Sequence, residues 1–322
     1  MVYTKPGTVE LSDVDEPVAG PGEVIVEVLA CGICGSELHG ISKPGFRQPP
    51  LVMGHEFSAR APTGDIVAVD PIVSCGQCEL CRAGHNEVCR QRRIIGIHRQ
   101  GAFAERVAVP ERLLHKLPKS VPAEQGALVE PLANALHAWR LGGGTSGSTV
   151  GVLGAGSIGI SMLLVSKHHG ARVSVTDLSA GRLELAARLG ADATGHELDG
   201  EFDIVVDAVG APVTRRASLE HLRPMGIAIW LGLLDPEPDF DALDMVRTEK
   251  RIAGSFAYSH SDFADAVALA AEVDLSWATS FDLGQGPTIF GELMAGRSDV
   301  VKALLHPGHL SPGGVEQAER SV

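Results

Sequence analysis

Four cysteines lie close together near residue 80 of the chain. They follow the spacing C-x2-C-x2-C-x7-C and are Cys75, Cys78, Cys81 and Cys89. Four thiolates on one short loop can close a tetrahedral Zn²⁺ shell, which leaves no position open for a substrate. The sequence starts without the basic and apolar segments of a secretory signal, and disulfides are rare in proteins that are not secreted. These cysteines therefore predict a structural zinc site.

A glycine-rich turn in the second half of the chain has the pattern of a dinucleotide site. Gly154, Gly156 and Gly159 form a G-x-G-x-x-G motif between a strand-like run and a helix pattern. In such a turn, backbone N–H groups at the helix N-terminus face a pyrophosphate. Asp177 ends the next expected strand, where its carboxylate can accept hydrogen bonds from the ribose hydroxyls of NAD. We therefore expect NAD binding, with NAD preferred over NADP.

Length and composition limit the other functions. The chain has 322 residues and a formal net charge of −13, which argues against nucleic acid or an anionic membrane as the main partner. Hydrophobic residues make up 44% of the chain, which is enough for a sizeable core. Residues 141–166 carry no charge, but they are rich in glycine, serine and threonine. They therefore predict a strand, a turn and a helix rather than a membrane span.

The elements that must position these residues change character along the chain. Up to about residue 135, short β-branched or alternating runs, broken by Gly and Pro, predict a β-rich domain. From about residue 136 to 276, strands and helices alternate, which predicts a parallel sheet covered on both faces. The expected strands cover residues 24–29, 66–69, 103–109, 149–153, 171–176, 202–206, 226–230 and 300–305, and the expected helices residues 127–141, 159–169, 181–189, 213–222 and 288–295.

Several motifs, taken in order, resemble the zinc-dependent medium-chain alcohol dehydrogenase family over residues 1–305. Besides the four-cysteine loop and the glycine-rich turn, they are Cys31-Gly-Ile-Cys34-Gly-Ser-Glu-Leu-His39, Gly54-His-Glu-Phe57 and Val129-Glu-Pro-Leu132. The resemblance implies an α/β protein with a GroES-like β-rich catalytic domain and a Rossmann domain built on a doubly wound parallel sheet. The catalytic domain would comprise residues 1–135, completed by 277–322, and the NAD-binding domain residues 136–276.

The resemblance also implies a second, catalytic zinc, and so two Zn²⁺ per chain. Cys34 and His55 would be ligands, and Glu56 or Glu130 would complete the shell. No cysteine follows residue 89, so the third ligand is a carboxylate or water, as in the sorbitol, threonine and butanediol dehydrogenase branch. Zinc of this kind lowers the pKa of an alcohol that it binds. A hydride would then pass from the alcohol to C4 of the nicotinamide.

Further roles follow residue by residue from the same resemblance. Ser36 and His39 match the proton relay between the alcohol and solvent. Glu37 stands where the family usually has an Asp that orients the zinc-binding histidine, so this contact either survives with the longer side chain or is lost. The residues expected to contact NAD are Gly154, Gly156, Ser157, Ile158, Gly159, Asp177, Arg182, Val209, Leu231, Gly232, Leu233 and Phe256.

Two further departures from the family concern a hairpin and the substrate pocket. The segment between Glu56 and Asp65 is short where the family normally has a longer hairpin. Gly40 and Ala257 stand where sorbitol dehydrogenases typically place a Tyr and an Arg that contact the polyol. Sorbitol itself is therefore disfavoured, and we expect a bulkier or less polar secondary alcohol, or a cyclitol.

Together these features predict a cytoplasmic, zinc- and NAD-dependent dehydrogenase that interconverts a secondary alcohol and its ketone. The substrate would be a polyol, a cyclitol or a similar small molecule. Three alternatives remain: a dehydrogenase of amino alcohols such as threonine, a zinc-free reductase of the same superfamily, and a non-catalytic dinucleotide-binding or sensor protein on the same fold. The family suggests a homodimer or a homotetramer.

Overall fold

The computed structural model describes residues 1–41, 47–235 and 240–308. The chain divides into two compact units. The first contains residues 1–73, 93–127 and 278–322, and the second residues 74–92 and 128–277. The four-cysteine loop therefore groups with the second unit. Residues 309–322, which we expected to help complete the catalytic domain, lie outside the described residues.

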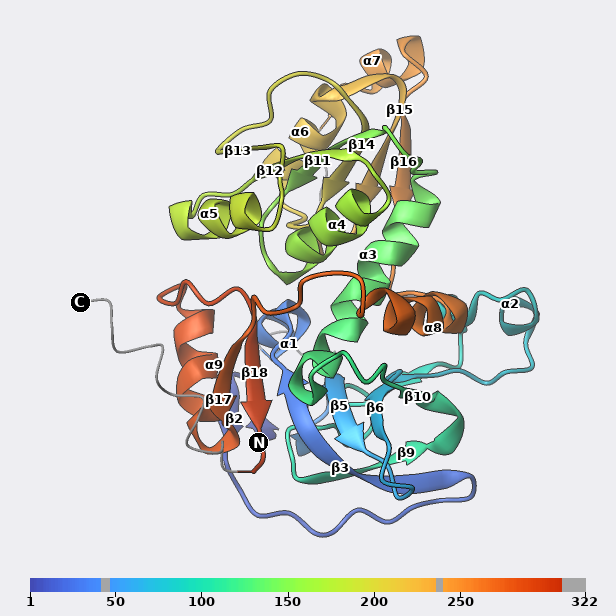
Figure 1. Ribbon diagram of the computed structural model, residues 1–322, viewed down its shortest axis with the longest axis vertical. Coiled ribbons are helices and arrows are strands. Elements are labelled where there is room, and N and C mark those ends of the chain that lie inside the picture. The colour runs from blue at the N-terminus through green and yellow to red at the C-terminus, as the bar shows by residue number, and fades with distance from the viewer. Residues whose placement is uncertain (42–46, 236–239, 309–322) are drawn as a thin grey trace. The chain divides into compact units, whose positions relative to one another are not determined.

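A seven-stranded sheet forms the centre of the first unit (Figure 1). Its strands follow the order β10-β6-β5-β3-β18-β17, and β9 also pairs with β3. Neighbouring strands are antiparallel except β17 and β18, which are parallel. The strands are β3 (Glu23–Gly32), β5 (Glu56–Arg60), β6 (Ile66–Val69), β9 (Arg106–Pro110), β10 (Leu114–Lys116), β17 (Thr279–Asp282) and β18 (Ala303–His306).

A tight turn and two smaller sheets complete the strands of the first unit. The expected short connection after Glu56 is a turn between β5 and β6, in which Ala61 N–H donates to Asp65 O at 2.9 Å. Gly64 in this turn has a φ of 86°, which favours glycine. The smaller sheets contain β2 (Thr8–Glu10), β1 (Val2–Lys5) and β4 (Leu51–Val52) in one, and β7 (Ile72–Val73) and β8 (Arg93–Ile94) in the other.

The core of the first unit joins the sheet to the last helix of the described chain. Tyr3, Phe57 and Phe103 are buried in this core together with Phe290. Phe290 lies on α9 (Gly286–Met294), which packs against the short helix α1 (Gly35–Gly40). Burial of these aromatic side chains fixes the end of β3 and α1, where the C-G-I-C-G-S-E-L-H run lies.

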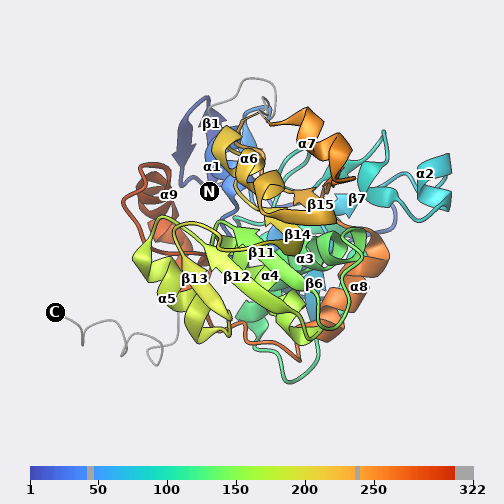
Figure 2. The ribbon, with the colours of Figure 1, turned by 90° about the horizontal axis from the view of Figure 1, so that it is seen from above.

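The second unit is built on a six-stranded sheet in which every neighbouring pair is parallel (Figure 2). The strand order β13-β12-β11-β14-β15-β16 is that of a doubly wound Rossmann sheet, as the alternating pattern predicts. The strands are β11 (Thr149–Leu153), β12 (Arg172–Thr176), β13 (Ala193–Gly195), β14 (Phe202–Asp207), β15 (Leu222–Trp230) and β16 (Arg251–Gly254).

Helices cover both faces of this sheet. In Figure 2, α4 and α5 lie on one face and α6 lies on the other. α3 packs against α4 and α8. The uncharged stretch at residues 141–166 forms β11, a turn and α4, as expected. The helices are α3 (Val129–Leu141), α4 (Ser157–His168), α5 (Ala180–Arg188), α6 (Pro212–Glu220), α7 (Ala242–Arg247) and α8 (His260–Leu269).

Several elements differ from the expectation. The strand expected at 103–109 begins only at Arg106, and the helix expected from residue 127 begins at Val129, after a 3₁₀ helix at Ala123–Leu128. β13, β16 and β17 are three or four residues long, too short to give a clear period. α8 was missed although it has a clear start signal. Ser259 Oγ accepts from Asp262 N–H at 3.1 Å, which is the capping-box pattern S-x-x-D.

Candidate metal centres and cofactor site

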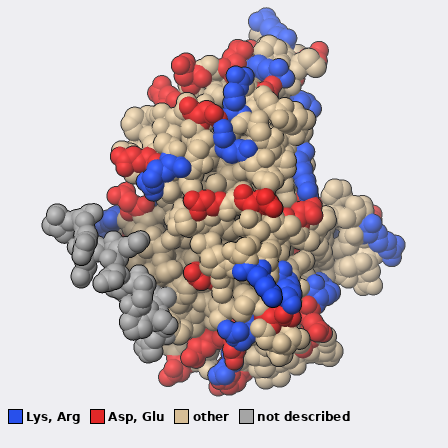
Figure 3. All heavy atoms as spheres, viewed as in Figure 1, with Lys and Arg blue, Asp and Glu red and all other residues tan. Residues whose placement is uncertain are grey.

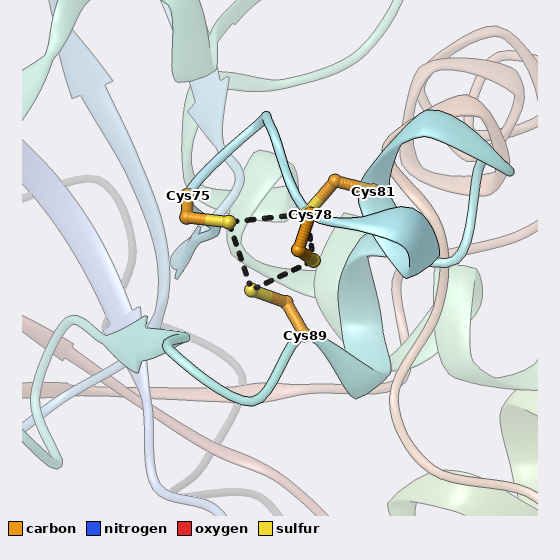
Figure 4. Close-up of side chains that lie close together, drawn as sticks. All are labelled: Cys75, Cys78, Cys81 and Cys89. Carbon is orange, nitrogen blue, oxygen red and sulfur yellow. Dashed lines mark hydrogen bonds between the residues drawn. The ribbon is translucent and has the colours of Figure 1, made fainter.

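The four cysteines of the loop bring their sulfur atoms together at one point (Figure 4). The Sγ–Sγ distances are 3.5 Å for Cys78–Cys81, 3.6 Å for Cys75–Cys89, and 3.9 Å for Cys75–Cys81 and Cys78–Cys89. A tetrahedron with Zn–S bonds of about 2.3 Å has edges of about 3.8 Å. The cluster therefore fits a tetrahedral zinc site, the geometry that its spacing predicts.

Two short helices hold the sulfurs in this arrangement. Cys78 precedes α2 (Glu79–Arg82), Cys81 lies within it, and Cys89 follows a 3₁₀ helix at Asn86–Val88. Backbone N–H groups of the loop lower the pKa of the Cys75 thiol to about 6. Desolvation and the neighbouring sulfurs raise the pKa of Cys81 to about 11. Four thiolates so close together need a cation, because their charges repel one another.

The cysteine loop is tied to the start of α8 by three contacts within the second unit. The His260 N–H donates to Asn86 Oδ1 at 2.8 Å, and His260 Nε2 lies 3.1 Å from Ser74 Oγ. The Arg92 guanidinium lies 4.7 Å from the centre of the Phe256 ring. These contacts join residues more than 160 positions apart, so the sequence pattern gave no sign of them. They connect the zinc loop to the segment that contains Phe256, an expected cofactor residue.

Cys81→Ser should remove one zinc per chain and lower the Tm. The free energy of closing a structural zinc site is part of the free energy of folding. A loss of 1 kcal/mol shifts the Tm of a domain of 150–250 residues by about 2–4 °C. We expect a fall of several degrees in calorimetry, with faster hydrogen exchange at the His260 amide. Unchanged zinc content and Tm would show that the cluster holds no structural metal.

A second group of metal-binding side chains lies in the first unit. Cys34, His55 and Glu56 place one ligand atom each within 4.8 Å of one another. Cys34 directly precedes α1, and Glu56 is the first residue of β5. His55 and Glu56 are buried, while Cys34 is half-buried. One thiolate, one imidazole and one carboxylate are a donor set that Zn²⁺ accepts with a fourth position left open.

Glu37 contacts His55, although it stands where the family usually has the shorter Asp. Its side chain is fully buried, and Oε1 lies 3.2 Å from His55 Nδ1. The longer side chain is held by two backbone donors, Gly54 N–H at 2.9 Å from Oε1 and Cys34 N–H at 3.0 Å from Oε2. A carboxylate on one ring nitrogen orients the other nitrogen for a metal. The family's supporting contact is therefore present with Glu in place of Asp.

The charged side chains that act on His55, Cys34 and Glu37, are both acidic. Burial lowers the pKa of this histidine, but the charges of Cys34 and Glu37 outweigh burial and raise it well above its ordinary value. Burial raises the pKa of Glu37, but His55 and the neighbouring donors outweigh it, and the net direction is downward. An imidazole held in the field of several acidic groups marks a place where positive charge is stabilised. This is the electrostatic condition that a bound cation requires.

The other residues expected at the catalytic centre take different positions. Ser36 Oγ is buried and has no hydrogen-bond partner among residues 1–41, 47–235 and 240–308. His39 is exposed at the end of α1. Glu130 belongs to the second unit, where Asn134 Nδ2 donates to its Oε1 at 3.1 Å. Glu56, in the first unit, lies in the cluster with Cys34 and His55.

The glycine-rich turn has the local geometry of a phosphate cradle. Gly154 has a φ of 95°, and a Cβ there would lie 2.5 Å from Val209 Cγ2. A Cβ on Gly159 would lie 1.8 Å from Gly154 O. A Cβ on Gly156, in contrast, would meet nothing within 4 Å. The first and third glycines are therefore needed for packing, and the second leaves free space above the start of α4, where a pyrophosphate fits.

Asp177 lies beside this turn with both carboxylate oxygens fixed. Ala155 N–H donates to Oδ2 at 2.8 Å, and Ser179 N–H donates to Oδ1 at 2.9 Å. Arg182 Nη1 lies 3.8 Å from Oδ2. Each carboxylate oxygen can accept more than one hydrogen bond, so the ribose hydroxyls of a dinucleotide can still bind. Ser157 Oγ, at the start of α4, is buried and has no hydrogen-bond partner in the described part of the chain.

The expected cofactor contacts after β14 and β15 lie on two touching loops. A Cβ on Gly232 would lie 2.1 Å from Val209 C, so the two loops approach each other closely. Asp207 Oδ1 accepts from Val209 N–H at 3.0 Å, and the Asp207 carbonyl accepts from Leu231 N–H at 3.0 Å. Leu233 is exposed on the second loop. Arg215 was not expected here, but its Nη2 donates to Gly232 O at 3.1 Å.

The surface and the helices add two observations on partners. On the face shown in Figure 3, acidic and basic side chains are interspersed rather than gathered by sign. In the described ranges, every helix is too short or too polar to span a lipid bilayer.

Comparisons with known proteins agree with this geometry. The Alcohol dehydrogenase GroES-like domain family matches residues 20–119, and the Zinc-binding dehydrogenase family matches residues 157–272. L-Threonine 3-dehydrogenase from Pyrococcus horikoshii is 35% identical over an alignment of 275 positions, and the match covers 76% of this chain and 79% of that protein. (R,R)-Butanediol dehydrogenase from Saccharomyces cerevisiae is 30% identical over an alignment of 375 positions, gaps included, and the match covers 96% of this chain and 98% of that protein.

A solved structure shows the same fold over the length of the chain. The solved structure is that of a Sinorhizobium meliloti protein, assigned as a zinc-binding dehydrogenase and bound to NADP, and it superposes on this chain with a TM-score of 0.86. It is 30% identical to this chain, and the match covers 95% of this chain and 98% of that one. The chain belongs to the zinc-dependent medium-chain alcohol dehydrogenase family and is an NAD(P)-dependent alcohol dehydrogenase.

Proposed function

We propose that this chain is a zinc-dependent, NAD-linked dehydrogenase that oxidises a secondary alcohol to a ketone and catalyses the reverse reaction. The observation that carries the proposal is the meeting of Cys34, His55 and Glu56 at one point, with Glu37 hydrogen-bonded to the histidine. Three protein ligands leave a fourth position for the substrate. In this proposal the cluster of Cys75, Cys78, Cys81 and Cys89 holds the second, structural zinc, and Glu56 rather than Glu130 is the third catalytic ligand.

The residues of the cluster have separable tasks in this proposal. Bound Zn²⁺ would supply Lewis-acid chemistry that lowers the pKa of the substrate hydroxyl. Cys34, His55 and Glu56 hold the ion, and Glu37 keeps the His55 ring in the orientation that this requires. The Ser36 hydroxyl, which is buried and has no hydrogen-bond partner in the described part of the chain, accepts the substrate proton while giving its own towards the exposed His39. Bound NAD⁺ would supply the hydride acceptor.

His39→Gln should slow alcohol oxidation by about 10- to 100-fold at pH 7 and clearly less at pH 9. At pH 7 the proton leaves Ser36 through the His39 imidazole, whereas at pH 9 hydroxide can take the proton directly. Steady-state kcat/KM at both pH values measures the difference. His85→Gln, at an exposed histidine of the cysteine loop, is the matched control and should leave both rates unchanged. An equal loss at both pH values would give His39 a purely structural role.

Substrate choice rests on two positions at which the sequence departs from sorbitol dehydrogenases. Gly40 and Ala257 offer no polar side chain to a polyol, so we propose a less polar secondary alcohol or a cyclitol rather than sorbitol. A second candidate is an amino alcohol such as L-threonine, because a threonine dehydrogenase is 35% identical to this chain. A difference of a few kcal/mol in a pocket decides between such substrates.

A substrate screen tests the proposed reaction directly. The purified protein is incubated with NAD⁺ and one alcohol at a time: polyols, cyclitols, butane-2,3-diol, L-threonine and simple secondary alcohols. We expect absorbance at the NADH wavelength to rise fastest with a secondary alcohol or a cyclitol, and slowly with sorbitol. Fastest turnover of L-threonine would select the second candidate, and no turnover of any alcohol with either NAD⁺ or NADP⁺ would contradict both.

Assembly and location are further parts of the proposal. β16 is the edge strand of the six-stranded sheet, so its outer side is available for pairing with another chain. We propose a homodimer or homotetramer formed through this edge, in a cytoplasmic protein. Light scattering after size-exclusion chromatography gives the mass, and a monomer at micromolar concentration would contradict this assembly.

A further inference from the structure

A buried ion pair reaches into the Cys34–His55–Glu56 cluster from the far end of the chain. Lys302 Nζ lies 2.5 Å from Glu56 Oε2, and each side chain is only 1% exposed. The same ammonium group donates to Ile33 O at 3.0 Å. The catalytic roles described above do not use Lys302, and the sequence motifs did not single it out.

The sheet is built around this pair. Lys302 directly precedes β18, whose residues Leu304 and Leu305 pair with the end of β3, and Gly32 of β3 pairs in turn with Glu56. A Cβ on Gly32 would lie 2.3 Å from Glu56 Oε2 and 3.3 Å from Lys302 Cδ. Gly32 therefore leaves the space in which the lysine and the carboxylate meet.

Burying Lys302 costs desolvation free energy, which its contacts must offset. Removing two charges from water is expensive, and a buried ion pair is often no more stabilising than an apolar pair of similar volume. The pair is thus poorly explained by stability alone. Its carboxylate also belongs to a group of three metal-binding side chains, so the ammonium group competes for a zinc ligand and repels the ion.

We infer that Lys302 is a positioning residue that holds one carboxylate oxygen of Glu56 and thereby weakens zinc binding at the catalytic site. The inference rests on the proposed catalytic zinc. It follows from the geometry because Lys302 Nζ and a metal bound by Cys34 and His55 would share the Glu56 carboxylate. A site built only for tight metal binding would place an uncharged group at Lys302.

The test measures metal affinity rather than activity. Metal is removed from the purified full-length protein and Co²⁺ is titrated back, and the visible absorption bands that are missing in Cys34→Ser protein report the catalytic site. Lys302→Met should tighten Co²⁺ binding by about 10- to 100-fold, the range over which groups beside metal ligands change affinity. Lys302→Gln, which is also uncharged, should tighten it similarly. Lys250→Met is the control, because Lys250 is also buried but pairs with Asp244 in the other unit. It should leave the affinity unchanged.

Repeating the lysine substitution in Glu56→Gln protein separates competition for the Glu56 carboxylate from repulsion between the lysine charge and the metal ion. In Glu56→Gln protein, Lys302→Met should improve Co²⁺ affinity much less than it does in the wild-type background. The double variant also removes both charges together, so it leaves no unpaired buried charge and should fold. Unchanged or weaker affinity in both single lysine variants would overturn the inference. An equal gain in both backgrounds would overturn the competition for Glu56.

Failure of the proposed function would look different. If wild-type protein bound only one zinc, or if Cys34→Ser still bound two, there would be no catalytic zinc in this cluster. If wild type bound two and Cys34→Ser one, the cluster would hold zinc, and the lysine variants alone would decide the role of Lys302.

Discussion

Cys34→Ser should reduce kcat/KM for alcohol oxidation by about 1,000-fold or more while the protein stays folded. Lewis-acid assistance by a metal is worth several kcal/mol, and every 1.36 kcal/mol changes the rate about tenfold. Serine is not a thiolate, so the cluster keeps only His55 and Glu56 as ligands. The fold should survive because Cys34 is half-buried, and its contact to Glu37 is made by the backbone N–H rather than by the sulfur.

The same protein preparations report zinc content, Tm and turnover. We expect Cys34→Ser to bind one zinc instead of two with an almost unchanged Tm, which is the opposite of the stability loss expected for Cys81→Ser. Cys31→Ala is the matched control. Cys31 is fully buried three residues away, but it belongs to neither metal cluster, so this variant should keep two zincs and turnover. Full activity of Cys34→Ser would contradict the catalytic-zinc proposal.

The grouping of the candidate ligands could be predicted because each lies in a short local motif. Cys75 to Cys89 occupy one loop, and this short connection allows few ways for four sulfurs to meet. His55 and Glu56 are adjacent in sequence, and Cys34 starts α1 directly after β3, which pairs with β5. Local sequence is thus enough to propose a donor set. It could not decide between Glu56 and Glu130, because both are acidic residues in short motifs that match the family.

Glu37 shows what sequence comparison leaves open. The extra methylene of Glu relative to Asp could have removed the contact to His55. The residue type alone does not predict whether the contact is kept or lost. The structure keeps it because Gly54 N–H and Cys34 N–H hold both carboxylate oxygens. Gly54 has a φ of 97° that turns its N–H towards Glu37, a backbone conformation that is not visible in the motif itself.

Contacts between distant segments were the least predictable. Lys302 and Glu56 are 246 positions apart, and His260 and Asn86 are 174 positions apart. Each pair depends on how a late strand or helix docks on an early one. A lone lysine within the otherwise apolar run at 300–305 was the available signal for Lys302. Charged residues are almost never fully buried unless they are paired, so this position called for a partner.

The alternating half of the chain was predicted more completely than the β-rich half. β11 and β14 lie in the centre of a parallel sheet, and each contains an uninterrupted buried apolar run, residues 150–153 in β11 and 204–206 in β14. The edge strand β16 has only four residues, with an exposed residue at each end, and gives no such run. In the first unit, strands are short and the pairing of β17 with β18 joins segments that carry no common motif.

NAD⁺ should be preferred over NADP⁺ by about a hundredfold or more in kcat/KM, and Asp177 should set this preference. A 2′-phosphate carries close to two negative charges, and each would repel the carboxylate by on the order of 4 kcal/mol at about 4 Å and an effective dielectric of 20. Even a fraction of that energy gives a hundredfold ratio. Asp177 cannot easily turn away, because Ala155 N–H and Ser179 N–H hold its two oxygens.

Two substitutions of Asp177 separate the effect of its charge on cofactor preference from the effect of its size. Asp177→Asn keeps the size of the side chain and removes its charge, so it should narrow the gap between NAD⁺ and NADP⁺. Asp177→Ala should narrow it further, because it also removes the steric contact with a 2′-phosphate. Equal use of both cofactors by the wild type would contradict the role of Asp177. If neither variant narrowed the gap, another residue would set the preference.

Arg182 should determine how far the preference for NAD⁺ over NADP⁺ can be reversed. In the wild type its Nη1 lies 3.8 Å from Asp177 Oδ2, so the two charges partly offset each other. Its Nε has no hydrogen-bond partner among the described residues. Without Asp177, the guanidinium is free to bind a 2′-phosphate, since Arg is suited to phosphate recognition. The gain in NADP⁺ use by Asp177→Ala should therefore disappear in the Asp177→Ala/Arg182→Ala double variant. If the gain persisted there, relief of repulsion alone would account for it, without attraction by Arg182.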